Sequence, residues 1–517
     1  MHERVLRDLL QGIPVQEEHG PRERRVSGLA YDSREVEPGF LFVAMDGQHT
    51  DGHRFIPQAV SRGAAVVVHA NPLVEYAPSA TYVRVASPRR VLSPIASAFY
   101  GNPSRELAVI GVTGTDGKSS TVWFIAQLLG RLGYRAGFLS TVSFQVADQM
   151  VKNPFRQSTP EASEIHGMLR EMVEAGRQYA VVEATSHGLS ERMNRLADVE
   201  FDAAVFTNVT HEHLEFHGTF EQYRSDKANL FRSLDRSSPK ADRAGSAPLL
   251  RAAVVNADDP SAEYFRASTK VPCSSFGTRA HADLSAREVQ ADITGSRFLL
   301  RWEGREAPAR VAIPGPFWVE NSLAACLTVS RVLGLDPLSL ASELQGLRCV
   351  QGRMDSVDLG QPFAVIVDYA HTPGAFEKLF PWIREHTSGR ITAVFGSGGE
   401  RDREKRRMQG RVAARHCDTL VLTDEDPRGE DRAAILEQIA EGCEGKTRGK
   451  DLFLVPDRPQ AIRLAVSRAG RGDTILLLGK GHEGSIIGPS GPAPWDERAE
   501  AERALRELGY EAGGVGS

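Results

Sequence analysis

The chain has 517 residues, of which 25% are charged and 41% hydrophobic, and its formal net charge at pH 7 is −5. This length exceeds what one hydrophobic core supports, so we expect about three domains. The composition is that of an ordinary globular protein, and the lack of a basic excess argues against nucleic acid as a partner.

The cysteines and the apolar runs indicate the compartment. The five cysteines are an odd number without C-x-x-C spacing, which argues against a disulfide framework and against a zinc ribbon. No run of about 18 apolar residues occurs, and the N-terminus carries charge where a signal peptide needs an apolar core. We therefore expect a cytoplasmic protein without membrane association. No sequence feature requires a partner protein, so we expect a monomer.

The first 107 residues have the pattern of a small α/β unit. Short β-rich runs at 26–34, 39–44 and 64–68 are separated by turns with Gly, Pro and Asp. From residue 108 to about 347, strands alternate with helical patterns, which predicts a largely parallel sheet with helices on both faces. Residues 236–248 are expected to form a surface loop without a function of its own. The expected strands of the second unit are 108–112, 179–183, 203–207 and 252–256.

A glycine loop follows the strand at 108–112. It reads Gly114-Thr115-Asp116-Gly117-Lys118-Ser119 and precedes a helical pattern. Inward N–H groups, a helix N-terminus and the Lys118 cation predict a polyphosphate site, and the Ser119 hydroxyl is placed to reach Mg²⁺. The strict G-x-x-x-x-G-K-[ST] pattern is not met, because Gly111 and Gly117 stand one residue too far apart. A plain glycine turn, however, leaves Lys118 and Ser119 unexplained.

Polar residues near two further strand ends are candidate metal ligands. Glu183 would face solvent if it stood alone, but Thr185, Ser186 and His187 follow it and favour a Mg²⁺ site. The zincin pattern H-E-x-x-H fails after His211, and His213 with His217 at i, i+4 is ordinarily a solvated pair. Beside a nucleotide loop, we favour one imidazole that helps to bind Mg²⁺. Lys227, taken alone, would be a surface residue.

A third strand–helix unit begins near residue 348. In open α/β sheets, ligands bind beyond the carboxyl ends of the strands, and the polar segments of this unit stand there. Strands are expected at 363–368, 391–396, 419–423 and 474–479, and the polar segments are 368–371, 396–399, 424–428 and 479–483.

Together these residues resemble the Mur ligases of bacterial cell-wall synthesis, most closely the MurE type, which adds a diamino acid to UDP-N-acetylmuramoyl-L-alanyl-D-glutamate. One motif alone would be weak evidence, but the set covers nearly the whole chain in the order of the family. The matching segments are 32–34, 113–119, 158–161, Glu183 with 185–187, 207–217, Lys227, Asn321, 352–354, 368–373, 398–403, 426–428 and 479–483.

The resemblance implies an α/β fold with three domains. Residues 1–107 would hold the uridine nucleotide, 108–347 would form a central P-loop ATPase with a mostly parallel sheet, and 348–517 would form a Rossmann-like domain that closes over the site. It implies ATP and Mg²⁺ as cofactors, with Lys227 carbamylated into a carboxylate-like metal ligand.

The resemblance also assigns roles to single residues, with small molecules as the partners. Lys118, Glu183, His213 and Lys227 would be catalytic, and Ser119, Glu183, His213 and carbamylated Lys227 would hold the metal. ATP would contact Gly114, Thr115, Asp116, Gly117, Lys118, Ser119, Ser120, Asn321, Arg353, Asp368 and His371. The UDP substrate would contact Ser33, Gln48, His49, Thr50, Ser158, Thr159, Thr185 and Arg192, and the diamino acid Arg401, Asp426, Arg428, Gly479 and Glu483.

The implied mechanism follows from charge. The substrate carboxylate attacks the γ-phosphate of ATP, Lys118 and Mg²⁺ neutralise the phosphoryl oxygens, and an acyl phosphate forms. The amine of the diamino acid then displaces phosphate, and domain closure keeps water out. Arg428 and Arg401 match residues that read the distal carboxylate of meso-diaminopimelate, which makes it the first expected acceptor.

Departures from the family pattern leave points open. Asp426 replaces the asparagine of a D-N-P-R motif, and an extra carboxylate there could favour L-lysine or L-ornithine as acceptor. Asp116 replaces the asparagine usual in the phosphate loop. A Gln and an Arg expected after His187 are missing, so Arg192 or Arg195 is expected to make that contact.

Two other functions would explain part of these motifs. An amide ligase of the folylpolyglutamate or cyanophycin type should lack the Asp32-Ser33-Arg34 and Asp426-Pro427-Arg428 segments, which are present. A nucleotide-gated binding module would not need three polar clusters in the third unit, because function lies in the site and not in the fold.

Overall fold

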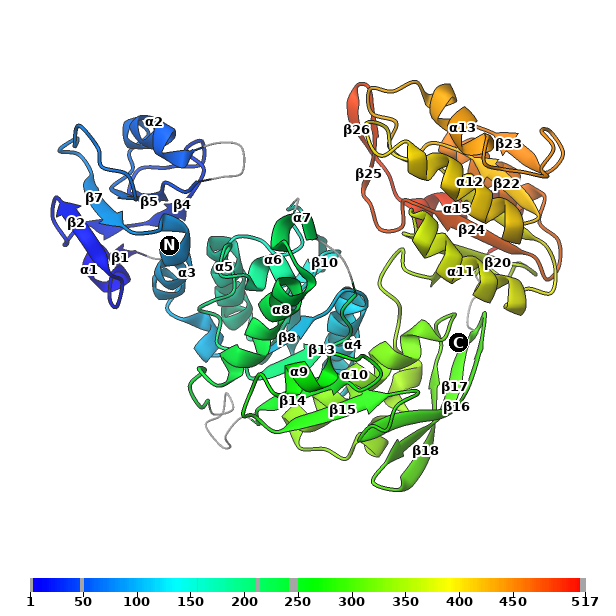
Figure 1. The fold of residues 1–517 in the computed structure, drawn as a ribbon, viewed down its shortest axis with the longest axis horizontal. Coiled ribbons are helices and arrows are strands. Elements are labelled where there is room, and N and C mark those ends of the chain that lie inside the picture. Colours follow the sequence, from blue (N-terminus) through cyan, green and yellow to red (C-terminus); the bar gives the residue numbers. More distant parts are fainter. Residues whose placement is uncertain (1–2, 47–50, 156, 211–213, 241–249, 512–517) are drawn as a thin grey trace. The chain divides into compact units, whose positions relative to one another are not determined.

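The computed structural model describes residues 3–46, 51–155, 157–210, 214–240 and 250–511, without the side chains of residues 214 and 215 (Figure 1). The chain folds into two compact units. Unit 1 comprises Met1–Ser285, Arg301–Glu306 and Glu320–Leu340, and unit 2 comprises Ala286–Leu300, Ala307–Val319 and Ala341–Ser517. Among the described helices, none combines the length and the apolar character that a membrane crossing needs.

The N-terminal part of unit 1 is a five-stranded sheet in the order β2-β7-β6-β5-β4. Strand β2 is antiparallel to β7 and the remaining pairs are parallel. Alternate strand residues pack against α1 and α3 on one face and against α2 on the other, so both faces are buried. Its elements are β1 (Arg4–Val5), α1 (Leu6–Leu9), β2 (Val15–His19), β3 (Arg25–Val26), β4 (Gly28–Ala30), β5 (Phe40–Val43), η1 (Gly52–Phe55), α2 (Ile56–Ser61), β6 (Val66–His69), β7 (Thr81–Val85), α3 (Pro88–Phe99) and η2 (Pro103–Arg105).

The larger sheet of unit 1 has β8 at its centre. Within this unit the strand order is β11-β10-β9-β12-β8-β13-β14-β15, and β9, β12, β8, β13, β14 and β15 are parallel, as the sequence predicts. The elements are β8 (Ala108–Thr113), α4 (Lys118–Arg131), β9 (Ala136–Leu139), β10 (Ser143–Gln145), β11 (Val151–Lys152), α5 (Ala162–Glu174), β12 (Tyr179–Glu183), α6 (Ser186–Leu189), β13 (Ala203–Phe206), α7 (Leu214–His217), α8 (Phe220–Leu234), β14 (Ala252–Asn256), α9 (Ala262–Arg266) and β15 (Cys273–Gly277).

A further stretch of strands, at 284–311, was missed by the sequence analysis. Strand β16 (Leu284–Asp292) continues the sheet from β15, and β17 (Gly295–Trp302) and β18 (Arg305–Val311) follow it in order. Strand β16 changes from buried to exposed along its length, and β17 and β18 mix buried with exposed residues. None of the three has the unbroken apolar run that marks the central strands. Next come α10 (Phe317–Leu333), η3 (Pro337–Leu340) and η4 (Glu343–Gly346).

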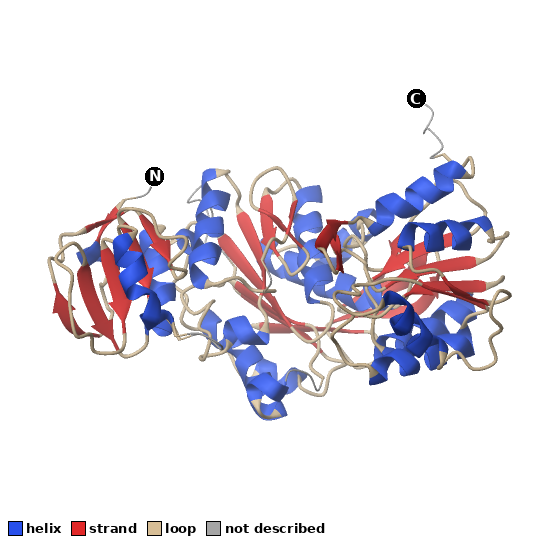
Figure 2. Cartoon of the chain, turned by 90° about the horizontal axis from the view of Figure 1, so that it is seen from above, coloured by secondary structure: helices blue, strands red, loops and turns tan. Residues whose placement is uncertain are grey.

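Unit 2 contains a six-stranded sheet in the order β19-β20-β24-β21-β22-β23. Alternate residues of its strands pack against α14 and α15, while Phe395 on the opposite face packs against Phe376 of α11. Helices flank both faces of this sheet in Figure 2. Its elements are β19 (Asp355–Ser356), β20 (Ala364–Asp368), α11 (Pro373–His386), β21 (Ile391–Phe395), α12 (Glu404–His416), β22 (Thr419–Leu422), α13 (Arg432–Ala440), β23 (Leu452–Leu454), α14 (Arg458–Ser467), β24 (Thr474–Leu478), β25 (Ser485–Gly488), β26 (Gly491–Pro494) and α15 (Glu497–Glu507).

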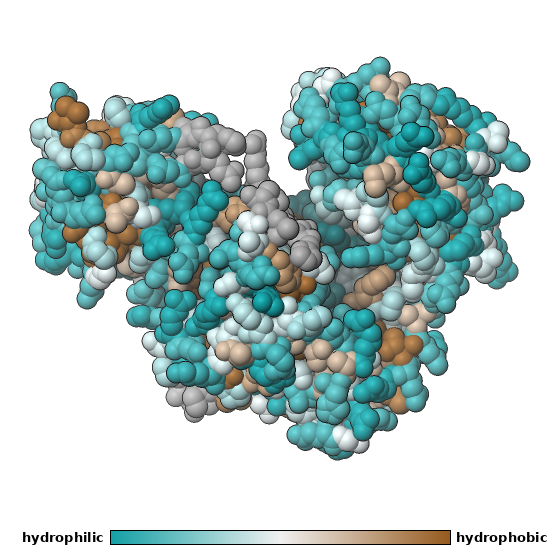
Figure 3. Space-filling view, viewed as in Figure 1, coloured by the Kyte–Doolittle hydropathy of each residue, from teal (hydrophilic) through white to brown (hydrophobic). Residues whose placement is uncertain are grey.

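The predicted surface loop at 236–248 needs one correction. Residues 241–249 lie outside the described part, but Lys240 is buried and its ammonium donates to the Asp202 carboxylate at 2.6 Å. The same ammonium donates to the carbonyls of Glu200 and Leu107. The side chain therefore joins the starts of β8 and β13 instead of extending into solvent. Apart from scattered apolar residues, the face of the molecule seen in Figure 3 is hydrophilic.

Candidate active site

The phosphate loop joins β8 to α4 through two glycines that no other residue could replace without strain. Gly117 has φ +80°, and a Cβ atom there would lie 2.5 Å from the Asn321 side-chain oxygen. At Gly114 a Cβ would lie 1.9 Å from the Thr207 hydroxyl. The backbone of the loop is thus packed against the ends of β13 and α10. The structure places the Asn321 side chain beside this loop.

Inside the loop, the Lys118 ammonium donates to the Thr115 carbonyl at 2.7 Å, so the cation folds back over the loop backbone. The Thr207 hydroxyl donates to the Asp116 carbonyl, and the Asn208 side chain exchanges hydrogen bonds with the Asp116 backbone. Ser120 is buried in the first turn of α4. These contacts hold the loop in the curved form that phosphate groups require.

Glu183, the last residue of β12, lies beside this loop. Its carboxylate accepts hydrogen bonds from the Ser119 hydroxyl and from the Thr141 backbone N–H and hydroxyl, each at 2.8 Å, and it is 3% exposed. The pairing of β12 with β8 explains the position, because the carboxyl ends of adjacent parallel strands share one edge. A carboxylate and a hydroxyl are oxygen ligands of the kind Mg²⁺ binds, so these residues fit that ion.

Lys227 of α8 also reaches the loop. It is 1% exposed, and its ammonium donates to the Gly114 carbonyl at 2.5 Å and lies over the Tyr223 ring. The surface position that a lone lysine suggests is therefore wrong. His217 is buried, with one ring nitrogen 2.7 Å from Asp226 and the other 3.1 Å from Ser186. His213, the other candidate imidazole, lies outside the described residues.

The residues expected to hold the muramoyl peptide meet at the end of β12. The hydroxyls of Thr159 and Thr185 are 2.8 Å apart, and Thr185 also caps the N-terminus of α6. Ser158 is half-buried beside them in sequence. Of the two candidate arginines, Arg195 is buried and donates to Glu161 and to the Thr159 carbonyl. Arg192 is exposed and its guanidinium stacks over the Phe216 ring at 4.9 Å.

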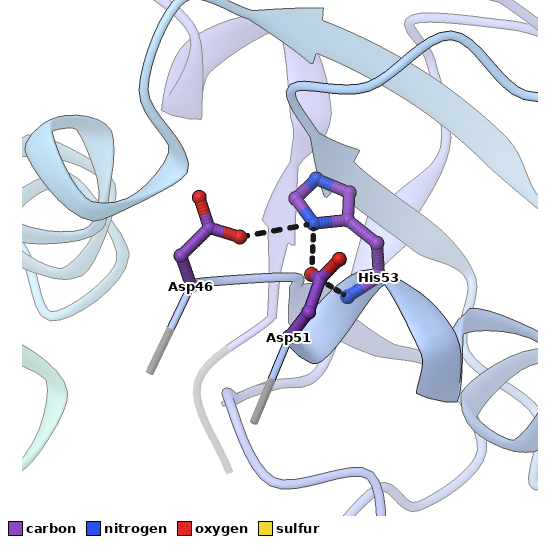
Figure 4. A group of neighbouring side chains, drawn as sticks. All are labelled: Asp46, Asp51 and His53. Carbon is purple, nitrogen blue, oxygen red and sulfur yellow. Dashed lines mark hydrogen bonds and ion pairs between the residues drawn. The ribbon is translucent and has the colours of Figure 1, made fainter. Parts of the chain in front are cut away.

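Only part of the expected uridine site can be described. Ser33 is buried and its hydroxyl donates to Gln58 at 2.8 Å, while Gln48, His49 and Thr50 lie outside the described residues. Next to them, Asp46, Asp51 and His53 face one another (Figure 4).

This trio has metal-ligand chemistry, but the ring of His53 is already engaged. Its Nδ1 atom is 2.6 Å from the Asp51 carboxylate, and its Nε2 atom accepts the Ala70 N–H at 2.9 Å. Both nitrogens are therefore used, with the ring proton on Nδ1. We interpret the trio as a clamp that holds Asp51 against the turn after β6.

A separate cluster in unit 2 contains three of the expected ATP residues. Asp368 ends β20 and accepts the backbone N–H groups of Met354 and Ala370, each at 2.8 Å. Burial raises the pKa of Asp368, against the opposing charge of Arg353. The Arg353 guanidinium stacks over Tyr369, and the His371 ring donates to the Tyr369 carbonyl. Arg353, Asp368 and His371 are thus brought together around one tyrosine.

The expected acceptor residues follow β22 and β24 in unit 2, where Lys480 links two of them. Its fully buried ammonium lies 2.8 Å from Asp426 and 2.6 Å from Glu483. Asp426 also accepts the Ile487 N–H at 2.9 Å. Asp426, which replaces the asparagine of the family motif, is therefore paired with Lys480.

Two other charges of this region have atoms without a partner. Among the described residues, neither the Glu425 Oε2 atom nor the Arg428 Nε atom has a hydrogen-bond partner, although both atoms are buried. A Cβ atom at Gly479 would lie 2.9 Å from Glu425 Oε2, so the carboxylate sits against the loop that follows β24. Arg401 is exposed in the neighbouring loop. Sequence reasoning did not single out Glu425, because its burial and its unpartnered oxygen are visible only in the folded chain.

Comparison with known proteins identifies the family of the chain. Three family models match: the catalytic domain of the Mur ligase family at 25–100, the Mur ligase middle domain at 112–329, and the Mur ligase glutamate ligase domain at 352–481. Proteins named UDP-N-acetylmuramyl-tripeptide synthetase from Roseiflexus sp. (strain RS-1) and Treponema denticola are 50% and 44% identical, over 95% and 93% of this chain and 96% and 92% of their own lengths.

A solved structure of a UDP-N-acetylmuramoyl-L-alanyl-D-glutamate--2,6-diaminopimelate ligase has a TM-score of 0.68 at 26% identity. The match covers 97% of this chain and 99% of that one. The three-domain α/β fold class expected from the sequence is therefore confirmed. With half of its residues shared with a relative over nearly its full length, the chain is an enzyme that belongs to the Mur ligase family.

Proposed function

We propose that this protein is an ATP-dependent ligase that adds a diamino acid to UDP-N-acetylmuramoyl-L-alanyl-D-glutamate through an acyl phosphate. The observation that carries the proposal is the grouping of Lys118, Ser119, Glu183 and Lys227 around the Gly114 turn. A cation, a carboxylate and a hydroxyl within one phosphate loop are what phosphoryl transfer requires. The names of the relatives point to the same substrate class.

In this mechanism the protein supplies charge and position. Lys118 moves from the Thr115 carbonyl to the phosphoryl oxygens and neutralises the charge that develops on them. Ser119 and Glu183 would hold Mg²⁺, which supplies further neutralisation when bound. Thr159 and Thr185 orient the substrate so that its carboxylate faces the γ-phosphate. We also propose Arg353, Asp368 and His371 as ATP-binding residues, because they match the positions that the family resemblance implies.

Lys227 is proposed to act as a carbamate. Addition of CO₂ to its neutral amine forms an N–C bond, releases one proton and leaves an anionic group with two oxygens. Because the Nζ atom contacts Gly114, that group would stand at the phosphate loop. It would join Glu183 as an oxygen ligand, which a protonated lysine cannot be.

The acceptor is proposed to be read by Glu425 and Arg428. The buried Glu425 carboxylate has an oxygen atom without a hydrogen-bond partner among the described residues, and half-buried Arg428 has a buried Nε atom in the same state. A carboxylate and a guanidinium of this kind suit the ammonium and the carboxylate of an amino acid. Arg428 and Arg401 favour meso-diaminopimelate, whose far end carries a carboxylate. Glu425 favours L-lysine or L-ornithine, whose side chains end in an amine.

The test is ATP-dependent phosphate release with the UDP-dipeptide substrate and each of the three acceptors separately. Turnover with diaminopimelate would mean that Arg428 and Arg401 determine the choice of acceptor. Turnover with lysine or ornithine would mean that Glu425 determines it. Lys118→Ala should abolish turnover with every acceptor, whereas Arg131→Ala at the far end of α4 should not. Absence of turnover with all three, in a protein that binds ATP, would refute the proposal.

A further inference from the structure

Arg458, the first residue of α14, lies beneath the carboxyl edge of the sheet in unit 2. Its Nη1 atom donates to the Asp424 carbonyl and its Nη2 atom to the Leu478 carbonyl, both at 2.8 Å. Each carbonyl stands directly before one of the two loops that carry the acceptor residues. Strand β21 lies between β22 and β24, so these two strands exchange no ladder hydrogen bonds. The guanidinium therefore ties together two loops that the sheet itself keeps apart.

Glu497, the first residue of α15, holds that guanidinium in place. The Nε atom of Arg458 lies 2.8 Å from Oε2 of Glu497, and Nη2 lies 2.6 Å from Oε1. Both side chains are fully buried, and Trp495 donates a further hydrogen bond to the same carboxylate at 2.7 Å. A buried charge pair is costly unless its geometry is good, and here the two parallel bonds fix the plane of the guanidinium.

Only arginine meets this set of contacts. Four acceptor atoms in three directions need a planar fork, whereas the lysine ammonium is a single point charge on a flexible stem. The pair is also close to the residues proposed to read the acceptor. Glu425 follows Asp424 in the chain, and its Oε2 atom would be 2.9 Å from a Cβ at Gly479, the residue after Leu478.

We propose that the Arg458–Glu497 pair is a positioning device that sets the spacing between the loop at 425–428 and the loop at 479–483. The inference rests on the proposed function, since it takes these loops as the acceptor site. Arg458 touches no substrate. It holds the carbonyl that precedes each loop and thereby fixes the distance between Glu425 and the Gly479 backbone. This distance matters because small displacements of binding groups lower the reaction rate strongly.

The test compares Arg458→Lys and Glu497→Gln with Arg463→Lys. Arg463 is a matched control because it joins the same two helices through Glu500 and Glu507 but, within the described part of the chain, donates to no strand carbonyl. For the first two variants we expect the KM of the diamino acid to rise by about tenfold or more, with the KM values of ATP and of the UDP substrate unchanged. Arg463→Lys should leave all three unchanged.

Diamino-acid binding measured by calorimetry and thermal unfolding of each variant complete the design. The turnover rate of the wild type tests the proposed function. The ratio of the diamino-acid KM in each variant to that in the wild type tests the role of the Arg458–Glu497 pair, so failure of one proposal can be distinguished from failure of the other. Equal increases in all three KM values, or unchanged acceptor KM, would overturn the proposal. Loss of the fold in both Arg458→Lys and Glu497→Gln would assign the pair to stability alone and overturn it as well.

Discussion

Glu425 and Asp426 are neighbours in the chain with opposite surroundings. Asp426 is paired with Lys480 and accepts the Ile487 N–H, so its charge is neutralised within the protein. Glu425 keeps a buried oxygen without a partner among the described residues. Burial of a carboxylate without a partner costs free energy, and a bound cation would offset this cost. We therefore expect Glu425, and not Asp426, to bind a ligand cation.

This difference predicts the outcome of a matched pair of substitutions. In Asp426→Asn the amide keeps an oxygen for the Ile487 N–H, and Lys480 keeps Glu483, so kcat/KM for each acceptor should change by less than about threefold. In Glu425→Gln the acceptor loses its countercharge and KM should rise by at least about tenfold. Steady-state kinetics with the accepted diamino acid provide the measurement. A larger effect from Asp426→Asn than from Glu425→Gln would contradict the assignment.

Glu425 also predicts a pH dependence. Burial raises the pKa of this carboxyl above the ordinary 4.5, although Lys405, His371, Lys480 and Arg458 act in the opposite direction. Only the ionised form attracts an ammonium group. Acceptor affinity should therefore be complete above the raised pKa and be lost as the pH falls through it, at a higher pH than for a free glutamate.

The measurement is calorimetric binding of the diamino acid in the absence of ATP, over a pH series in which thermal unfolding shows the protein to be folded. Asp426→Asn should keep the same profile, and Glu425→Gln should bind weakly at every pH with a flat profile. A wild-type affinity that stays constant down to pH 4.5 would count against ionised Glu425 as the binding group.

At the scale of elements, the strand–loop–helix from β8 to α4 shows what sets a phosphate loop apart from an ordinary turn. Gly117, the N-cap of α4, is left-handed, and a Cβ atom there would clash with Asn321, whereas a Cβ atom at Gly130 in the last turn of α4 would meet open space. The backbone geometry therefore requires glycine at position 117, whereas glycine at position 130 only lowers the stability of the helix.

Alanine at the two positions should therefore act in opposite directions. Gly117→Ala should lower the free energy of unfolding by at least about 1 kcal/mol, because the left-handed conformation disfavours a Cβ atom and Asn321 must move. Gly130→Ala should raise it by about 0.5–1 kcal/mol, since alanine has the higher helix propensity. Denaturant unfolding of both variants is the measurement. Equal and small effects would mean that Asn321 does not confine Gly117.

The elements also show how far the sequence could predict the structure. Strands at 108–112, 179–183, 203–207 and 252–256 were located correctly, because a strand buried on both faces is an unbroken apolar run. The strands at 284–311 have no such run and were missed. Motif spacing located the polar segments, but the pairing of Lys480 with Asp426, 54 residues away, and the contacts of Arg458 depend on which strands become neighbours. Those contacts leave no local signal in the sequence.

At the scale of the whole molecule, the two compact units do not follow the order of the chain. The family model for the middle domain covers 112–329, yet 286–300 and 307–319 within it belong to unit 2. In that unit the Ser296 hydroxyl donates to the Gly315 carbonyl, and the Phe317 ring lies against Trp382 at 6.4 Å. These segments therefore form part of the packing of the C-terminal unit.

This composition predicts how fragments behave. A fragment of residues 286–517 should unfold at a higher temperature than one of residues 341–517, because the shorter piece lacks two segments of unit 2 and uncovers Trp382, which is 9% exposed in the full chain. Tryptophan fluorescence during thermal unfolding is the measurement, and Trp382→Phe in the longer fragment identifies the reporting residue. Identical midpoints for the two fragments would show that 286–319 contribute nothing to unit 2.

The same division has a practical meaning for chimeric enzymes. A crossover placed at 347/348, the domain boundary expected from the sequence, would join the C-terminal part of one parent to the 286–300 and 307–319 segments of the other. Each hybrid would then carry a mismatched seam inside unit 2. A donor block that starts at residue 286 carries these segments together with their own partners, at the cost of importing 301–306 and 320–340 into the recipient's first unit. A chimera made with a single crossover therefore has mismatched packing in one of the two units: in unit 2 if the crossover is at 347/348, and in unit 1 if it is at 286.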